Sequence, residues 1–263
     1  MWPHPIFVIN LKTSADRRKA AEDQLLAQGL TPTFVEAVDG RRISDAEVAA
    51  LVDFQGRLRR APKPLNRAEI GCYLSHCAVL ERIVAEDIAQ ALVMEDDLLA
   101  TPELAPVLDA IATRTLPSYE MIKVGISELQ TKPFTPIMAL TAISSLVRRH
   151  NVVNSNMAYV ITRAGAERFL TRARPIRYPV DVAMNRSWRH GMDILSVDPW
   201  PVGPNAAFRS TIGDERFAEA KHPGTLRQRL ERRFRKGYDS LSKRIDIQAR
   251  LKRDAAWKRT HGL

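Results

Sequence analysis

Three adjacent carboxylates, Glu95, Asp96 and Asp97, follow directly after the apolar run 89–94. Side chains alternate along an extended segment, so Glu95 and Asp97 should point to one side and Asp96 to the other. Two carboxylates on one side offer the oxygen ligands that Mg²⁺ or Mn²⁺ prefers, with open positions for water or phosphate. A cation would also relieve the mutual repulsion of the carboxylates, about 1 kcal/mol per pair in water. The spacing equally allows Asp96 or Asp97 to cap the following turn.

Basic side chains that could bind a diphosphate occur at Arg17, at Arg18 and in the segment 57–67. Each of them is equally explained as a solvated surface charge. The sequence has neither the G-x-x-x-x-G-K pattern nor the G-x-G-x-x-G pattern, which argues against a P-loop enzyme and a dinucleotide dehydrogenase. There is also no G-x-S-x-G nucleophile motif.

Cys72, His76 and Cys77 share one predicted helix but have no further ligand cluster near them in the sequence. A zinc site is therefore disfavoured, and His76 is expected to be a packed or capping residue. Five residues of helix turn Cys72 and Cys77 about 140° apart, so we expect no disulfide between them and a reduced, cytoplasmic protein.

Strand-like and helix-like segments alternate through the first half, which predicts an α/β fold with a sheet covered on both faces. The strongest helix begins at Asn66 as N-cap, with Glu69 completing a capping box, and Thr101 is expected to cap another helix. The segment 56–65 is expected to be a basic loop. The predicted strands are 6–9, 33–38, 89–94, 119–124, 142–147, 156–162 and 194–197, and the main predicted helices are 17–28, 66–86 and 163–172.

The net charge of +10 is concentrated at one end of the sequence. Residues 227–263 hold thirteen Lys or Arg and four acidic residues, with apolar residues near helical spacing. We therefore expect a globular domain over 1–220 and a basic amphipathic helical tail over 221–263. Such a helix fits an anionic membrane surface through residues 227–259, or it packs on the body by its apolar edge. Nucleic acid is the least favoured partner, since no nucleic-acid module is recognisable.

A spanning helix is not expected, because the longest uncharged run, 133–147, contains two prolines and is short of the roughly 18–20 residues required. The first ten residues lack the basic region of a secretory signal and have the composition of a first strand. We expect the protein in the cytoplasm, peripheral on the inner face of the plasma membrane if the tail binds there.

The sequence resembles glycosyltransferase family 25, which includes lipopolysaccharide core glycosyltransferases and collagen galactosyltransferases. The combination of the E-I-G-C-x-L-S-H block with a strand that ends in E-D-D carries the resemblance, which extends over about residues 5–212. The matching segments are Ile9-Asn-Leu11, Asp16-Arg-Arg18, Ala37-Val-Asp-Gly40, Glu69-Ile-Gly-Cys-Tyr-Leu-Ser-His76, Ala91-Leu-Val-Met-Glu-Asp-Asp97 and Ala158-Tyr-Val-Ile161, with a looser match from Pro179-Val-Asp181 to Ser210-Thr-Ile212.

The resemblance implies a GT-A-like nucleotide-sugar-binding fold with a central mixed sheet, a UDP-sugar donor, Mn²⁺ (or Mg²⁺) and inversion at the anomeric carbon. It also implies a saccharide or lipid-linked saccharide acceptor. Glu95-Asp96-Asp97 would correspond to the family's D-x-D-like motif, with Asp97 and Glu95 as metal ligands and Asp97 as the direct one. The residues expected on the donor side are Asn10, Leu11, Arg17, Glu69, Ser75, His76, Glu95 and Asp96.

An inverting transfer needs a base that takes the proton of the acceptor hydroxyl. We expect Asp181 in this role, with His76 and His150 as alternatives; a plain helix N-cap also explains Asp181. Two other functions remain open: a non-catalytic basic adaptor, and a metal-dependent phosphohydrolase, although no second carboxylate cluster supports a two-metal site.

Overall fold

The computed structural model describes residues 2–127, 133–208 and 225–263, and its centre is one mixed β-sheet. The strand order is β2-β1-β3-β8-β5-β9-β7-β6, and β10 pairs with β4 and β5. Pairing is parallel for β1 with β2 and β3, and antiparallel for β8 with β3 and β5. The strands are β1 (Ile6–Asn10), β2 (Thr33–Glu36), β3 (Gln90–Glu95), β4 (Leu98–Ala100), β5 (Met121–Gly125), β6 (Phe134–Ala139), β7 (Ser145–Arg149), β8 (Ala158–Thr162), β9 (Ile194–Asp198) and β10 (Val202–Pro204).

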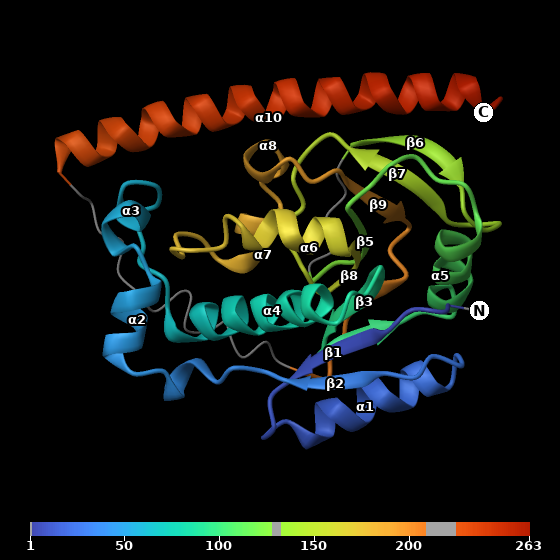
Figure 1. The fold of residues 1–263 in the computed structure, drawn as a ribbon, viewed down its shortest axis with the longest axis horizontal. Helices are drawn as coiled ribbons and strands as arrows, with labels where there is room; N and C mark the ends of the chain where they lie inside the picture. Colours follow the sequence, from blue (N-terminus) through green and yellow to red (C-terminus); the bar gives the residue numbers. More distant parts are fainter. Residues whose placement is uncertain (1, 128–132, 209–224) are drawn as a thin grey trace.

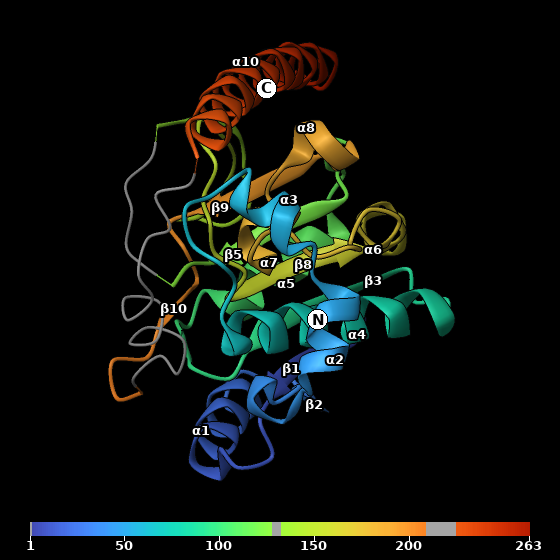
Figure 2. The same ribbon diagram turned by 90° about the vertical axis from the view of Figure 1, so that its left-hand side faces the viewer.

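Helices cover both faces of this sheet, and a long helix, α10, runs the length of the molecule above it (Figures 1 and 2). One face packs on α1 and α5, and the other packs on α4, α6 and α7. The predicted mixed α/β class and the C-terminal helix are confirmed, and the arrangement is consistent with a GT-A-like fold. The helices are α1 (Ala15–Leu26), α2 (Asp45–Leu51), α3 (Phe54–Leu58), α4 (Arg67–Ala85), α5 (Leu104–Thr113), α6 (Arg163–Leu170), α7 (Val180–Met184), α8 (Ser187–His190) and α10 (Leu226–Thr260), with a short 3₁₀ turn at Gly40–Arg42.

The alternation of side chains along β3 decides which helix each of its residues meets. Leu92 and Met94 pack on the side of α1 and α5, whereas Ala91 and Val93 pack on the side of α4 and α6. β3 lies inside the sheet and is apolar on both faces, as a strand covered on both sides requires. Its polar end, Glu95, emerges on the α4 side at the edge of the sheet.

Helix α4 is fixed at its N-terminus by the predicted capping box. Asn66 Oδ1 accepts the Glu69 N–H (2.7 Å), and a Glu69 carboxylate oxygen accepts the Asn66 N–H (3.1 Å). The helix also approaches the 38–40 turn very closely. A Cβ at Gly71 would lie 2.5 Å from the Val38 carbonyl oxygen, so only glycine permits this contact. The close approach brings the next turn of α4 against the carboxyl ends of β1 and β3.

Two local predictions were wrong, and one edge strand was missed. Helix α5 begins after Glu103 rather than at Thr101, because the Thr101 hydroxyl donates to the Pro201 carbonyl instead of capping. The segment expected as a loop over 56–65 starts inside α3, which Asp53 caps by accepting the Gly56 N–H. Strand β6 was not predicted at all; it tolerates Pro136 because it lies at the sheet edge beside a bulge.

Helix α10 attaches to the body through charged residues rather than through its apolar edge. Asp193, buried beside β9, pairs with Arg148 of β7 and with Arg250 and Arg253 of α10, and Asp254 of α10 pairs with Arg148 in turn. The apolar row on the first two thirds of the helix is exposed to solvent: Leu226, Leu230, Phe234, Tyr238, Leu241 and Ile245. The packing by an apolar edge that the sequence allowed is therefore wrong for these residues.

The predicted boundary at residue 220 lies outside the described residues, as does the end of the looser match, Ser210–Ile212. Within the described ranges, no helix is both long enough and apolar enough to cross a bilayer.

Candidate functional site

Two adjoining cavities lie at the carboxyl edge of β1 and β3. The β1 cavity, about 330 Å³, lies between β1, the start of α1, the 37–41 turn and α4. The α7 cavity, about 280 Å³, lies between the 155–157 segment, the start of α7 and the 204–208 segment. Cys72, Glu95 and Asp97 line both cavities. Ligands bind at this edge of open α/β sheets, because the loops that follow the strands gather there.

Asp96 points towards α1 and is held in place by two partners. Asn10, at the end of β1, donates to one oxygen (2.7 Å), and Arg17 of α1 donates to the other (3.3 Å). Burial raises the pKa of Asp96, and the bonds from Asn10 and Arg17 oppose that rise. The Arg17 guanidinium also lies over the Phe208 ring, 5.6 Å from its centre. These contacts place a cation at the mouth of the β1 cavity.

Glu95 points to the opposite side of the sheet and meets α4. His76 is buried, with Nε2 3.3 Å from Glu95 Oε1 and Nδ1 2.9 Å from the Tyr159 hydroxyl. Burial raises the pKa of Tyr159 well above its usual value, so the phenol stays protonated. The contacts with Tyr159 on one side and Glu95 on the other fix the orientation of the His76 ring.

Cys72 lies one helical turn before His76 and completes a compact group. Its sulfur, a His76 nitrogen and a Glu95 oxygen all lie within 4.8 Å of one another. The sequence analysis disfavoured a metal at Cys72 and His76 because no third ligand was near in the sequence. The third side chain of the group, Glu95, comes from β3, across the helix–sheet interface.

Asp97 is the residue of the triplet with an unsatisfied carboxylate. Its Oδ1 is buried and has no hydrogen-bond partner among the described residues. Burial, and then the charges of Glu95 and Asp96, raise its pKa to about 7. An orphaned buried carboxylate oxygen next to a second carboxylate fits a divalent cation with oxygen ligands. Glu95 and Asp97 are therefore the pair that could hold such an ion.

Glu69 and Ser75 have clear local roles on α4. Glu69 lines the α7 cavity while it completes the capping box at Asn66. The Ser75 hydroxyl accepts the Val38 N–H (2.8 Å) and donates to the Gly71 carbonyl (2.7 Å). Both residues fix the walls of the cavities.

Asp181 lies in the first turn of α7, where its carboxylate accepts the Val182 N–H (2.8 Å). It is not the N-cap, which is Pro179. Asp181 lines the α7 cavity. Its charge acts on the buried ammonium of Lys123, which donates to the carbonyls of Val153 and Ser155.

The structure brings most of the predicted site residues together, and it separates a few. His150 lines neither cavity, and its Nε2 lies 2.8 Å from the Thr135 hydroxyl at the β6–β7 edge. Asn10 also lines neither cavity but positions Asp96 from behind. The β1 cavity contains Leu11, Arg17, Ser75, His76 and Asp96, the α7 cavity contains Glu69 and Asp181, and both contain Glu95 and Asp97.

Sequence reasoning did not assign a role to Tyr159, Lys123, Asn205 or Phe208. The alternation along β8 places Tyr159 on the α4 face with Ile161, which was a usable signal. The Asn205 N–H donates to the Asp97 carbonyl (2.9 Å) across a long separation in sequence. No local pattern could have predicted that contact.

Comparison with known proteins matches this site region to one family. The family model described as "Glycosyltransferase family 25 (LPS biosynthesis protein)" matches residues 3–184. Human procollagen galactosyltransferase 2 is 32% identical over 185 residues, covering 67% of this chain and 29% of the relative. Zebrafish (Danio rerio) procollagen galactosyltransferase 1 is 29% identical, covering 67% of this chain and 30% of the relative. The chain thus spans about a third or less of the length of these relatives.

A further human relative is named inactive glycosyltransferase 25 family member 3. It is 28% identical to this chain, and the matched region covers 67% of this chain and 30% of the relative. Among solved structures, A197 from STIV superposes with a TM-score of 0.38 at 11% identity, covering 73% of this chain and 81% of that one, which is too low to add to the assignment. The family model covers well over half of the chain, including β1, α4, β3 and the acidic triplet, and on this basis the chain belongs to glycosyltransferase family 25.

Proposed function

We propose that this chain is a metal-dependent inverting glycosyltransferase that moves a hexose from a UDP-sugar to a saccharide acceptor. The names of the relatives make UDP-galactose the first donor to test, and the description of the family makes lipopolysaccharide core the first acceptor. The observation that carries the proposal is the position of Glu95 and Asp97, which line two adjoining cavities at once. A donor in one cavity and an acceptor in the other would meet at these carboxylates.

The nucleotide would occupy the β1 cavity. Arg17 offers positive charge to this cavity. Asp96 accepts hydrogen bonds from both Arg17 and Asn10, and so fixes the arginine relative to the end of β1. Asp97 and Glu95 would hold Mn²⁺ (or Mg²⁺) against the diphosphate. When bound, the cation supplies the positive charge that stabilises the leaving diphosphate.

The acceptor would occupy the α7 cavity, where Asp181 accepts the proton of the attacking hydroxyl. Attack from the side opposite to the leaving diphosphate would invert the anomeric carbon, and the α7 cavity adjoins the β1 cavity at Glu95 and Asp97. Lys123 donates to the Val153 carbonyl and so holds the 153–155 segment that forms a wall of the cavity. Burial lowers the pKa of Lys123 to about 7, and the charge of Asp181 opposes that fall.

The direct test is release of UDP from a panel of UDP-sugars, measured with and without MnCl₂ and with and without saccharide acceptors. We expect release that requires both Mn²⁺ and an acceptor. Release of phosphate without any acceptor would instead indicate a phosphohydrolase. Absence of UDP binding in the presence of Mn²⁺ would indicate a non-catalytic relative, such as the family members named inactive.

We also propose that α10 attaches the protein to an anionic membrane, on the cytoplasmic face of the plasma membrane. The exposed apolar row from Leu226 to Ile245 faces away from the body, while the acidic residues Asp239, Asp246 and Asp254 face the body. The outward side of the helix therefore combines apolar and basic groups. Such a side binds an anionic lipid surface through burial of apolar area and through about 1 kcal/mol for each basic residue near the surface.

A further inference from the structure

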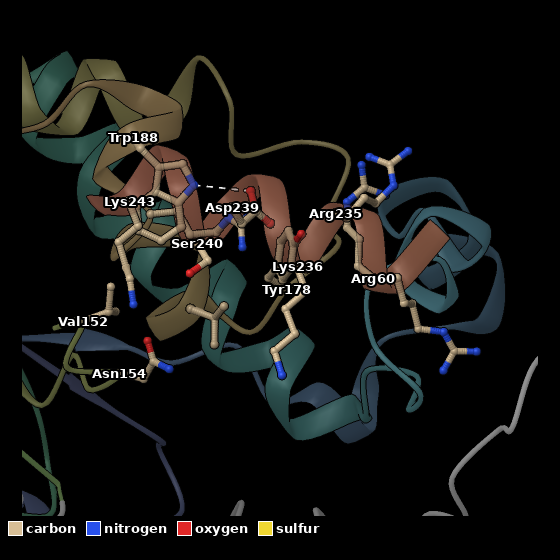
Figure 3. A pocket seen from close by; sticks show the side chains of 13 residues that line it. Arg60, Val152, Asn154, Tyr178, Trp188, Arg235, Lys236, Asp239, Ser240 and Lys243 are labelled. Carbon is tan, nitrogen blue, oxygen red and sulfur yellow. Dashed lines mark hydrogen bonds and ion pairs between the residues drawn. The ribbon is translucent and has the colours of Figure 1, made fainter. Parts of the chain in front are cut away.

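A third cavity, of about 470 Å³, lies between α10 and the body (Figure 3). One wall comes from α10, and the other comes from the 152–154 segment, from Arg60 and from the residues around α7 and α8. Its volume falls within the 300–1,000 Å³ usual for small-molecule sites. The lining is strongly basic and contains Arg60, Arg186, Arg232, Arg235, Lys236 and Lys243.

Two of the basic side chains that line this α10 cavity, Lys236 and Lys243, are not compensated by an acidic partner in the described part of the chain. Asp239 is the carboxylate in its lining, and it is already engaged by Arg186 (2.6 Å) and Arg189 (2.8 Å). No carboxylate among the described residues pairs with Lys236 or Lys243. Figure 3 shows both lysine side chains leaving α10 on the same side, with Lys243 extending towards Val152 and Asn154.

A neighbouring cavity near α6 is also rich in arginine, and three of its arginines are paired with carboxylates. Arg174, Arg177 and Arg189 pair with Glu81, Asp53 and Asp239, respectively. Lys236 and Lys243 line the α10 cavity but not this neighbouring one. Burial, together with the nearby charges of Arg235 and Arg177, lowers the pKa of Arg60, although Tyr178 acts in the opposite direction. A bound anion would relieve this repulsion.

The α10 cavity and the proposed acceptor cavity are lined by the same two segments of the chain. Asn154 and Val182 line the α10 cavity, and their direct neighbours Ser155 and Asp181 line the α7 cavity. An acceptor that uses both cavities would have to extend past these two segments. Tyr178 and Trp188 add aromatic surface to the basic wall, a composition that suits a ligand with an apolar ring face and a negative charge.

We infer that the acceptor is an anionic saccharide whose phosphate group binds in the α10 cavity while its hydroxyl reaches Asp181. This inference rests on the proposed transferase function. Ammonium groups bind phosphate by charge-assisted hydrogen bonds, so the cavity would select a phosphorylated saccharide over the uncharged one and fix its position relative to Asp181.

The test compares binding of a hexose 6-phosphate, the free hexose and inorganic phosphate to the full chain, by calorimetry without divalent ions. The test variant is Lys236→Gln with Lys243→Gln. The matched control is Arg244→Gln with Lys252→Gln, which removes the same charge from exposed positions of the same helix outside the cavity. We expect the test variant to weaken hexose 6-phosphate binding about tenfold or more, with little change in the control. Circular dichroism checks that α10 remains folded in both.

Equal losses in the test and control variants would show attraction to the general charge of the helix and would overturn the inference. Loss of binding in an Arg17→Gln variant but not in the test variant would place the anion in the β1 cavity and would also overturn it. Tight binding of inorganic phosphate with no gain from the hexose would assign the cavity to free phosphate. If the test variant lost binding to anionic vesicles without any hexose 6-phosphate binding in the wild type, the cavity would belong to a lipid headgroup.

The failure of this inference is distinguishable from failure of the transferase proposal. UDP binding with Mn²⁺, measured on the same variants, reports on the β1 cavity and should be unchanged by Lys236→Gln with Lys243→Gln. Loss of the phosphate effect with intact UDP binding and transfer rejects only the anionic acceptor. Absence of UDP binding in the wild type rejects the transferase proposal itself.

Discussion

Within the acidic triplet, Asp97 is the carboxylate whose ionised form is least favourable, because burial and the charges of Glu95 and Asp96 oppose it. Its pKa of about 7, against an ordinary value of 3.8, means that without a bound cation the folded state loses stability as the pH rises from about 4 to about 7, and the full cost of the ionised form remains at higher pH. The local environment of Asp97 is thus arranged for an added positive charge rather than for stability.

Asp97→Asn should raise the melting temperature of the metal-free protein at pH 8, since the neutral amide removes the cost of a buried charge. The same variant should lose most of the stabilisation that MnCl₂ gives the wild type. Thermal unfolding with and without Mn²⁺ measures both effects. Asp23→Asn on the exposed side of α1 is the control and should change neither. A metal-free variant that melts lower than the wild type would contradict this account.

Asp181→Asn should lower kcat by about 10²–10⁴-fold, the usual contribution of a general base, because an amide cannot accept the acceptor proton. The affinity for UDP should not change, since Asp181 lines the α7 cavity and not the β1 cavity. Steady-state transfer and UDP calorimetry separate the two effects. Asp45→Asn, on exposed α2, serves as the control. Turnover within a few-fold of the wild type would remove Asp181 from the role of base.

At the scale of elements, the short helix α8 depends on a neutral histidine. His190 Nε2 donates to the Met184 carbonyl (2.9 Å), and Nδ1 accepts the Met192 N–H (3.2 Å). Burial first, and then the charge of Arg250, lower the pKa of His190 to about 4, against the Met184 bond and Asp246, which raise it. A protonated ring would lose the bond from Met192.

The unfolded chain binds a proton at His190 below about pH 6.5, whereas the folded protein does so only near pH 4. This histidine therefore contributes stability above pH 6.5 that is lost as the pH falls towards 4, by up to about 1.4 kcal/mol per pH unit. His190→Gln should flatten the dependence of unfolding free energy on pH between 6.5 and 5. Urea unfolding at several pH values measures the slope. The exposed His261→Gln variant should keep the wild-type slope, and an equal slope in both variants would contradict the assignment.

The junction between the body and α10 is a buried network of alternating charges. Asp193 receives three arginines, two of them from α10, and its side chain is 7% exposed. Burial works against the ionised Asp193 carboxylate, but Arg148 and Arg250 hold its pKa below the usual value. Asp193→Asn should destabilise the protein by about 3–5 kcal/mol, because it leaves buried arginines without their partner.

Chemical unfolding of Asp193→Asn, together with limited proteolysis of α10, measures this loss. Asp45→Asn, which breaks an exposed ion pair with Arg67, should cost about 1 kcal/mol or less. A loss at Asp193 no larger than at Asp45 would show that α10 is held by other contacts.

At the scale of the whole molecule, α10 covers one side of the body (Figures 1 and 2). The apolar row of this helix is exposed to solvent. Phe234 is 77% exposed and Ile245 is 62% exposed. Phe234→Ser with Ile245→Ser should lower binding to phosphatidylglycerol vesicles by about tenfold or more, since each apolar side chain is worth about 1.5–3 kcal/mol when buried.

Ile143→Ser, at an exposed position between β6 and β7, is the matched control and should bind vesicles like the wild type. Added salt should weaken binding of all these proteins because the basic residues act through electrostatics. Vesicle co-sedimentation gives the affinities. Unchanged binding in the Phe234 and Ile245 double variant would reject attachment through this row.

The membrane proposal and the anionic acceptor proposal place the two ligands on different sides of one helix. The outward side of α10 carries the apolar row, and the inward side carries Lys236 and Lys243 above the α10 cavity. A lipid-linked saccharide would thus bind on the inward side of α10, while the outward side of the same helix attaches the protein to the membrane. The vesicle variants and the cavity variants test the two sides separately.

The sequence by itself determined the local features: the capping box at Asn66, the apolar strand β3, and the acidic triplet at its end. It also determined that Glu95 and Asp96 point to opposite sides, because alternation is a property of a single strand. The basic, amphipathic character of α10 was equally visible. Each of these follows from residues that are neighbours in the chain.

Only the tertiary structure decided which side chains meet across the sheet. It joined His76 and Cys72 to Glu95, Asn10 and Arg17 to Asp96, and it turned the charged side of α10 towards the body. The strand order and the buried charges of Arg148 and Asp193 set these contacts, and both depend on residues far apart in the chain. The sequence of a helix shows which side chains it carries. The buried charges of the body, Arg148 and Asp193, decide which side of α10 faces the body.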